Sequence, residues 1–183
     1  MPLHALAFSH IGIFVADIER MEAFYSGFLG FTVTDRGHLP GASGPIPLVF
    51  LSRDPDEHHQ LVLAGGRPAQ VDFNVVNQIS FRADSLSTLK ALHAALPSQP
   101  VTDIAPVTHG NAISVYFRDP EGNRIEVFVD TPWYVTQPQR VPIDLTLDDA
   151  VLWAWAERHA RALPGFEPRE QWRARLAARM ADG

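Results

Sequence analysis

The chain of 183 residues contains no cysteine, and this absence narrows the chemistry that is open to it. Disulfides, thiolate metal sites and a cysteine nucleophile are all excluded. Any metal ion must therefore be bound by histidine, carboxylate, amide or water ligands. A chain of this length forms one domain, or one domain with an appendage, and it buries a proper core without covalent cross-links.

Long apolar runs and clusters of positive charge are also missing. No stretch approaches the roughly 18 apolar residues of a membrane span, and the start, Met1-Pro2-Leu3-His4, lacks the basic region of a signal peptide. The formal net charge of −6, without a run of lysine or arginine, argues against a nucleic-acid-binding protein. We therefore expect a cytoplasmic enzyme or binding protein whose partner is a small molecule rather than a nucleic acid or a membrane.

What the sequence does contain is an internal duplication. Each copy opens with an apolar, alternating strand pattern and later carries an Arg-Asp-Pro turn, at residues 53–55 and 118–120. Residues 38–47, rich in glycine and proline, are expected to form a loop. The remaining pattern predicts a strand, a helix and three strands twice, with strands at 8–15, 31–34, 48–51 and 59–63, then at 75–83, 101–107, 112–117 and 124–130.

Two β-α-β-β-β modules predict an α+β fold, in which two half-barrels, each backed by a helix, close on a half-open, barrel-like cleft. The modules are expected at about residues 5–66 and 75–131, within a domain covering 1–135. Residues 136–183 lie outside the duplication and predict an extended connector followed by two helices. The modules could pair within one chain or be exchanged between two chains, so a homodimer is possible.

Strand alternation selects the candidate site residues. Side chains alternate between the two faces of a strand. If the apolar side chains of each opening strand face their helix, His10 faces the cleft in the first module, and Gln78, rather than Asn77, does so in the second. Glu126 lies opposite an apolar strand face and also points at the cleft.

The two Arg-Asp-Pro turns can be aligned with one another. This alignment matches Arg124 to His59 and Glu126 to Leu61. We therefore expect a cleft-facing His59 on the strand that follows the first turn, while His58 points away. Because Leu61 cannot bind a metal, the predicted ligand set has three members.

Those three members, His10, Gln78 and Glu126, suit Fe(II), Mn(II), Zn(II) or Ni(II). A buried carboxylate is costly unless a cation or hydrogen bonds compensate it, which gives Glu126 a physical reason to face a metal. Each residue also has a structural interpretation. Glu126 could be a salt-bridged edge residue, His10 a hydrogen-bonded core histidine, and Gln78 a partner of water or backbone.

The segment from Tyr116 to Glu126, YFRDPEGNRIE, set in this duplicated pattern, resembles the vicinal oxygen chelate superfamily. That superfamily includes glyoxalase I, fosfomycin and bleomycin resistance proteins, and type I extradiol dioxygenases. The resemblance covers about residues 5–135 and is greatest to one-domain extradiol dioxygenases. It implies His10 and Glu126 as metal ligands, while the second iron-binding histidine of that family falls on Gln78.

The resemblance also implies a function. It predicts a metal-dependent enzyme, with Fe(II) favoured, that acts on a small catechol-like substrate with vicinal oxygens. His59 would be the acid/base, helped by His109 and Tyr116 near the substrate hydroxyls. The alternatives are a glyoxalase-like isomerase or lyase, in which glutamine is an accepted ligand, and a metal-free binding protein of the bleomycin resistance type.

Each of the three predicted catalytic side chains also has a purely structural interpretation. The near-neutral pKa of an ordinary histidine suits proton transfer by His59, but His59 could also be a partly exposed strand histidine. His109 could be a solvated loop residue and Tyr116 a core aromatic. Trp133 and Tyr134 could close the cleft or, as we favour, pack the tail against the barrel.

Overall fold

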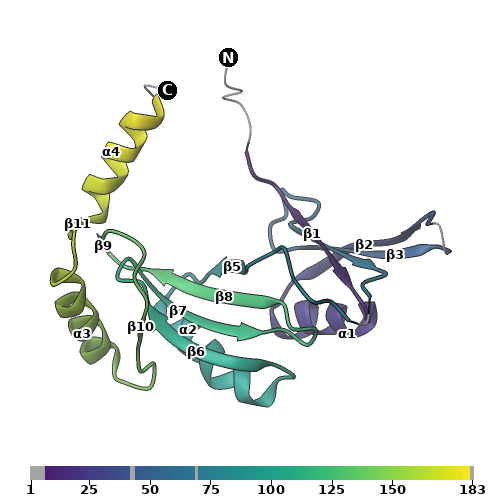
Figure 1. The fold of residues 1–183 in the computed structure, drawn as a ribbon, viewed down its shortest axis with the longest axis horizontal. Coiled ribbons are helices and arrows are strands. Elements are labelled where there is room, and N and C mark those ends of the chain that lie inside the picture. Colours follow the sequence, from purple (N-terminus) through teal and green to yellow (C-terminus); the bar gives the residue numbers. More distant parts are fainter. Residues whose placement is uncertain (1–6, 42–43, 69, 182–183) are drawn as a thin grey trace. The chain divides into compact units, whose positions relative to one another are not determined.

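The computed structural model describes residues 7–41, 44–68 and 70–181. The chain divides into two compact units, Met1–Val75 and Val76–Gly183, and each contains one β-α-β-β-β module (Figure 1). The α+β class and the duplicated element order are therefore confirmed. The closing of the two modules around a common cleft stays a prediction.

The first unit is a four-stranded sheet in the order β1-β4-β3-β2, with β1 parallel to β4 and the other neighbours antiparallel. A helix packs against β3 and β4, begins after Asp17, whose side chain accepts from Arg20 N, and buries Met21 completely. A π-helical turn continues it before Gly30, whose φ of 71° suits a residue without a side chain. The elements are β1 (Ile11–Val15), α1 (Ile18–Ala23), the π-helical turn (Phe24–Phe28), β2 (Thr32–Leu39), β3 (Ile46–Ser52) and β4 (Leu61–Gly65).

Two predictions for this unit are wrong in part. The loop predicted at residues 38–47 is shorter, because β2 continues to Leu39 and β3 starts at Ile46. These strand ends are mostly solvent-accessible, so they lack the apolar alternation that marks a half-buried strand. The strand predicted from His59 starts only at Leu61. The preceding turn is closed by hydrogen bonds from Gln60 N to Leu51 O (2.9 Å) and from Arg53 N to Gln60 Oε1 (3.0 Å).

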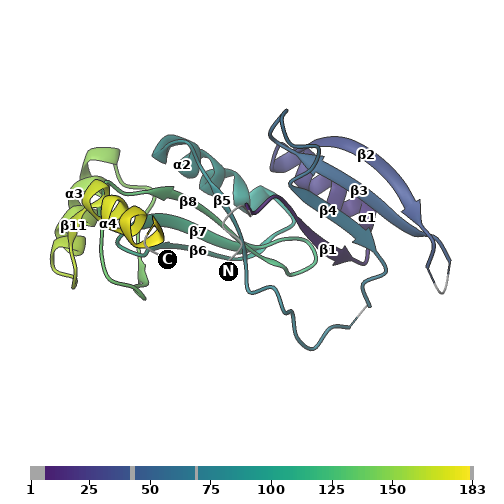
Figure 2. The same ribbon diagram turned by 90° about the horizontal axis from the view of Figure 1, so that it is seen from above.

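The second unit is a five-stranded sheet in the order β10-β6-β7-β8-β5, in which β5 and β8 run parallel. Its helix contacts β7 and β8 and lies along one face of the sheet (Figure 2). Ser85 caps this helix by accepting from Thr88 N at 3.1 Å. Gln78 immediately precedes β5, which is shorter than predicted. The elements of the module are β5 (Ile79–Arg82), α2 (Leu86–Ala95), a 3-10 turn (Leu96–Ser98), β6 (Thr102–Thr108), β7 (Ala112–Arg118) and β8 (Arg124–Asp130).

The extension after β8 is bound to the second unit. Its connector adds β10 to β6, and Trp133 is buried, with its indole donating to Gly110 O at 2.6 Å. Packing, not a lid, is therefore the role of Trp133. No helix in the described part of the chain has the length and apolar character needed to cross a bilayer. The remaining elements are β9 (Trp133–Tyr134), β10 (Val141–Pro142), α3 (Asp149–Arg161), β11 (Glu167–Pro168) and α4 (Arg169–Ala181).

Candidate functional site

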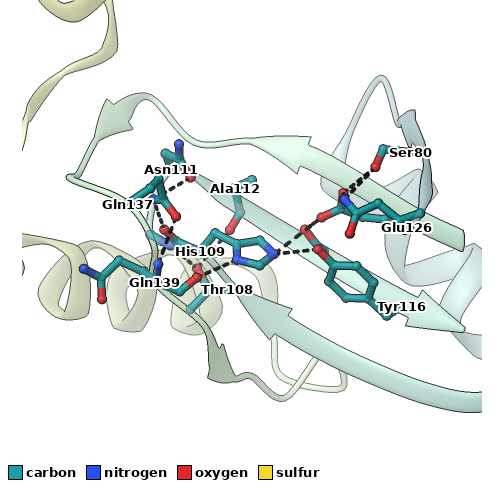
Figure 3. Close-up of polar contacts among 12 residues, drawn as sticks. Ser80, Thr108, His109, Asn111, Ala112, Tyr116, Glu126, Gln137 and Gln139 are labelled. Atoms are coloured by element: carbon teal, nitrogen blue, oxygen red, sulfur yellow. Dashed lines mark hydrogen bonds and ion pairs between the residues drawn. The ribbon is translucent and has the colours of Figure 1, made fainter. Parts of the chain in front are cut away.

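Glu126 lies at the centre of a polar cluster in the second unit (Figure 3). It is only 7% exposed, and its strand β8 lies between β5 and β7, where it pairs with Ser80 and Tyr116. The interpretation of Glu126 as a residue on a sheet edge is therefore wrong. A carboxylate buried in this way must be compensated by hydrogen-bond donors or a cation.

Four side chains compensate the Glu126 carboxylate. Oε2 accepts from Gln78 Nε2 at 2.9 Å and from Ser80 Oγ at 2.6 Å. Oε1 accepts from Ser114 Oγ at 2.8 Å and lies 3.4 Å from His109 Nε2. Burial alone would raise the pKa of Glu126, but its interactions with His109, Ser80, Tyr116 and Ser114 outweigh burial and lower the pKa from 4.5 to about 2. The group is thus a buried anion at neutral pH.

His109 and Tyr116 form a pair beside this anion. His109 Nε2 lies 3.0 Å from the Tyr116 hydroxyl, and the Nδ1 atom of the same ring lies 2.6 Å from Gln139 O. The hydrogen bond with Glu126 raises the pKa of His109 against the opposing effect of burial. Burial, followed by the Glu126 charge, raises the pKa of Tyr116 to about 12, so the phenol stays protonated at neutral pH. His109 is therefore not a solvated loop residue.

The histidines of the first unit form a separate group. The rings of His10 and His59 lie 4.3 Å apart between centroids, and His59 also contacts Phe50 at 5.2 Å. His58 Nδ1 is 2.8 Å from His59 Nδ1. Burial, with the charges that His10 and His58 can carry, lowers the pKa of His59, so this imidazole is neutral at neutral pH and can accept a proton. His10 is exposed, which argues against its interpretation as a core histidine.

The register of the two parallel strand pairs corrects one prediction. Gly12 pairs with Val62 in the first unit, and Ser80 pairs with Glu126 in the second. The counterpart of Glu126 is therefore Val62, so the predicted match to Leu61 is wrong. Nine residues separate the paired Leu51 and Leu61.

The equivalent gap in the second unit, between Phe117 and Ile125, is seven residues. An alignment through the two turns therefore cannot preserve the strand register. His59 lies in the longer turn, where strand alternation does not apply, so the argument that placed it in the cleft fails. Like Leu61, Val62 has no atom that could bind a metal, so the predicted ligand set still has three members.

The structure thus brings the predicted residues together in two groups. Gln78, His109, Tyr116 and Glu126 meet in the second unit, and Gln78, not Asn77, contacts the carboxylate. His10 and His59 meet in the first unit. Two members of the cluster were missed by the sequence analysis, namely Ser80 and Ser114. Both could have been found by alternation, since they lie two residues from Gln78 and Tyr116 on the same strand faces.

The donor types can be compared with the needs of a divalent metal ion. In the part of the chain that the structure describes, no three histidine, aspartate or glutamate side chains converge as a ready metal cluster. The carboxylate of Glu126 and the imidazole of His10 are nevertheless suitable ligands. Gln78 directs its amide nitrogen at Glu126, and a half-turn of the amide would present its oxygen instead. The residue types therefore fit a metal with mixed nitrogen and oxygen ligands.

Comparison with known proteins identifies the family of the chain. The model of the Glyoxalase/Bleomycin resistance protein/Dioxygenase superfamily matches residues 7–127. The chain belongs to this superfamily. It is 28% identical over 127 residues to biphenyl-2,3-diol 1,2-dioxygenase 2 of Rhodococcus globerulus, covering 67% of this chain and 62% of the relative. It is 32% identical over 88 residues to biphenyl-2,3-diol 1,2-dioxygenase 3 of the same organism, covering 45% and 46%. The matches thus span less than two thirds of either relative.

Known structures share the fold. The fosfomycin resistance protein FosX from Listeria monocytogenes, determined with Mn(II) and sulfate, superposes with a TM-score of 0.54 at 16% identity, covering 68% of this chain and 93% of that one. The trypanothione-dependent glyoxalase I of Leishmania major gives a TM-score of 0.54 at 23% identity, covering 68% and 87%. These two structures show that the chain shares its fold with proteins of different chemistries.

Proposed function

We propose that the protein is a metal-dependent enzyme that cleaves a small catechol-like substrate with two vicinal oxygens, in the manner of an extradiol dioxygenase. The observation that carries the proposal is the cluster of an ionised, buried Glu126 with His109 and Tyr116. Such a cluster offers one anionic ligand and two polar groups able to contact substrate oxygens. Two dioxygenases among the relatives support the choice of reaction.

His10, Gln78 and Glu126 would hold the metal, with Fe(II) favoured and Mn(II), Zn(II) or Ni(II) as alternatives. When bound, such an ion supplies Lewis acidity toward substrate oxygens and, if it is iron, the capacity to activate dioxygen. This ligand set rests on the sequence and on the family. The structure contributes the buried, ionised state of Glu126 and its contact with Gln78.

The side chains around the ion would manage protons. His59, neutral at neutral pH because its pKa is lowered, would accept a proton from a substrate hydroxyl. His109 would hold or return a proton through Nε2, the atom that faces Tyr116 and Glu126. The phenol of Tyr116, protonated at neutral pH, would donate a hydrogen bond to a substrate oxygen.

A metal-dependent isomerase or lyase is the second candidate, and Gln78 is the observation that favours it. An amide oxygen is a neutral, harder ligand than imidazole, so its presence beside Glu126 suits Lewis-acid polarisation better than iron redox chemistry. The fold similarity to a glyoxalase I is compatible with this candidate.

Metal analysis and oxygen uptake together test the proposal. The protein would be purified without chelator, reconstituted anaerobically with Fe(II), and supplied with a panel of catechols in an oxygen electrode. We expect stoichiometric metal and oxygen uptake with a ring-cleaved product, both lost in Glu126→Gln. Stoichiometric metal without uptake would favour the isomerase or lyase. No stoichiometric metal, with ligand affinity unchanged in His10→Ala, would contradict both and leave a metal-free binding protein.

A further inference from the structure

The turn between β6 and β7, which carries His109, is held by residues that lie after the second module (Figure 3). Thr131 Oγ1 and the indole of Trp133 both donate to Gly110 O, at 3.0 and 2.6 Å. A methyl group on Gly110, whose φ is 78°, would lie 2.4 Å from the side chain of Val135. The turn and the connector are thus fitted closely to one another.

The connector also contacts the imidazole of His109 directly. Its Nδ1 atom lies 2.6 Å from the backbone oxygen of Gln139. A carbonyl oxygen can only accept a hydrogen bond, so Nδ1 must carry a proton whether the ring is neutral or charged. Proton exchange is thereby confined to Nε2, which faces the Tyr116 hydroxyl and the Glu126 carboxylate.

The side chain of Gln137 hydrogen-bonds to both residues of the contact between His109 and Gln139. Its Nε2 donates to His109 O at 2.7 Å and lies 3.2 Å from Asn111 Oδ1 and 3.3 Å from Val135 O. Its Oε1 accepts from Gln139 N at 3.0 Å. One amide side chain therefore links the backbone of His109 to the backbone of the residue whose carbonyl fixes the imidazole.

Arg140, the next residue of the connector, contacts Tyr116, the partner of His109. The guanidinium of Arg140 lies 5.4 Å from the centre of the Tyr116 ring, within the range of a cation–π contact. The side chain of Gln139, in contrast, turns away and donates to Thr136 O at 3.0 Å. Residues 137–140, which we call the positioning segment, thus contact both His109 and Tyr116.

We propose that the positioning segment fixes the tautomer and orientation of His109, with Gln137 as the positioning residue that holds the Gln139 carbonyl against Nδ1. Residues 137–140 lie beyond the residues that the family model matches, which end at 127. The consequence of this positioning for catalysis rests on the proposed function. The tautomer itself does not, and it can be observed without any substrate.

Nitrogen NMR of the histidine rings tests the tautomer. The 183-residue chain, labelled with ¹⁵N-histidine, would be examined as purified and after chelator treatment, and the His109 signals among the eight histidines would be assigned from the spectrum of His109→Gln. At a pH where the ring is neutral, we expect a single tautomer protonated at Nδ1. In Gln137→Met, which removes both the donor and the acceptor while keeping the length of the side chain, we expect a mixture of tautomers. Gln137→Glu, which removes only the donor, should also give a mixture of tautomers.

Gln139→Ala is the matched control, because it deletes a neighbouring amide but keeps the backbone carbonyl. It should retain the wild-type tautomer. Gln137 is exposed, so its variants should fold, which circular dichroism would check. An Nε2-protonated ring in the wild type, or an unchanged tautomer in both Gln137 variants, would overturn the proposal.

A kinetic measurement extends the test if the proposed reaction is found. Misplacing a group that exchanges protons in the transition state lowers kcat more than it changes KM. We expect a loss of roughly tenfold in kcat for Gln137→Met with little change in KM, and no loss for Gln139→Ala. A protein without dioxygenase activity would contradict the proposed function, while the tautomer measurement would still decide the role of Gln137.

Discussion

The two units repeat one element order, yet they differ at the place where parallel strands meet. The first has Gly12 paired with Val62, and the second has Ser80 paired with Glu126. The two strand pairs are parallel in both units, so the difference at this position lies in the side chains. In the second unit a hydroxyl and a carboxylate occur together, and the hydroxyl donates to the carboxylate at 2.6 Å.

The comparison shows how a duplicated module can acquire unequal chemistry. A carboxylate on a central strand needs several donors before its burial is tolerable, and the second unit supplies Gln78, Ser80, Ser114 and His109. The first unit, without an anion at that position, has His58 and His59 in the turn before β4 and His10 just before β1. One module therefore supplies a fixed charge, and the other supplies imidazoles.

Glu126→Val would give the second unit the apolar residue of the first and should have the largest effect. It removes the anion and leaves four donors, of which Ser114 is fully buried, without their acceptor, at a cost of about 3 kcal/mol in the free energy of unfolding. We also expect loss of stoichiometric metal and of activity. Urea unfolding and metal analysis would measure both effects.

The control for this variant is Glu157→Gln, which removes a surface carboxylate paired with Arg161 on α3. It should change the free energy of unfolding by about 0.5 kcal/mol or less. If Glu126→Val were as stable and as active as this control, the cluster around Glu126 would be neither a structural nor a functional centre.

The acid stability of the metal-free protein should report the same cluster. The pKa of Glu126 is lowered from 4.5 to about 2 in the folded state. Its stabilisation of about 3 kcal/mol is therefore fully present above pH 4.5 and is lost as the pH falls toward 2. The raised pKa of His109 acts in the opposite sense: its stabilisation is present below 6.5 and disappears as the pH rises through the folded value.

Urea midpoints measured between pH 2 and 8, for wild type and Glu126→Gln, would separate these contributions. The variant should lose the acid dependence due to Glu126 and, because Glu126 is the main cause of the His109 shift, part of the dependence at higher pH. Surface carboxylates such as Glu22, whose pKa Arg36 lowers, titrate in both proteins and cancel in the difference. Identical pH profiles of the wild type and Glu126→Gln would mean that the hydrogen-bond donors do not stabilise the ionised Glu126 carboxylate.

Alternation along the strands made much of the second unit predictable. Gln78 was distinguished from Asn77, and Glu126 was placed on the polar face of β8, because one-residue steps reverse side-chain direction. The contact between Gln78 and Glu126 at 2.9 Å confirms both assignments. Ser80 obeys the same rule and was overlooked only because serine carries no chemical signature by itself.

The features that the sequence did not predict are set by backbone segments without regular secondary structure. The longer turn of the first unit shifted the register, so that Val62, not Leu61, is the counterpart of Glu126. The contact between His109 and Gln139 spans thirty residues and passes through a connector without periodic structure. No pattern of apolar residues encodes such a contact, because it is set by successive turns rather than by the repeat of a helix or strand.

Gln78→His would sharpen the comparison by adding an imidazole beside the anion. If a metal is bound there, replacing a neutral amide by imidazole should strengthen Fe(II) binding by roughly tenfold, or about 1.4 kcal/mol. Competition with a coloured chelator would measure the affinity. Asn77→His, one residue away and directed to the other face, is the matched control and should leave the affinity unchanged. Equal affinities in the two variants would exclude Gln78 from the ligand set.

The smallest change in stability is expected for substitutions of His58 and His59 in the first unit. These two substitutions should differ in their effect on activity. His58 is exposed and His59 only partly buried, so alanine at either position should alter the free energy of unfolding by about 0.5 kcal/mol or less. The two differ in their surroundings, because His59 packs against His10 and Phe50, and its pKa is lowered.

If His59 is the proton acceptor, His59→Ala should lower kcat by about 100-fold or more, whereas His58→Ala should retain most of the activity. Steady-state kinetics of the two variants, each checked for metal content, would measure this difference. Equal losses would mean that the histidine pair acts only through local packing. A loss confined to His59→Ala would show that the first unit, which lacks the buried anion of the second, still contributes a group to the reaction.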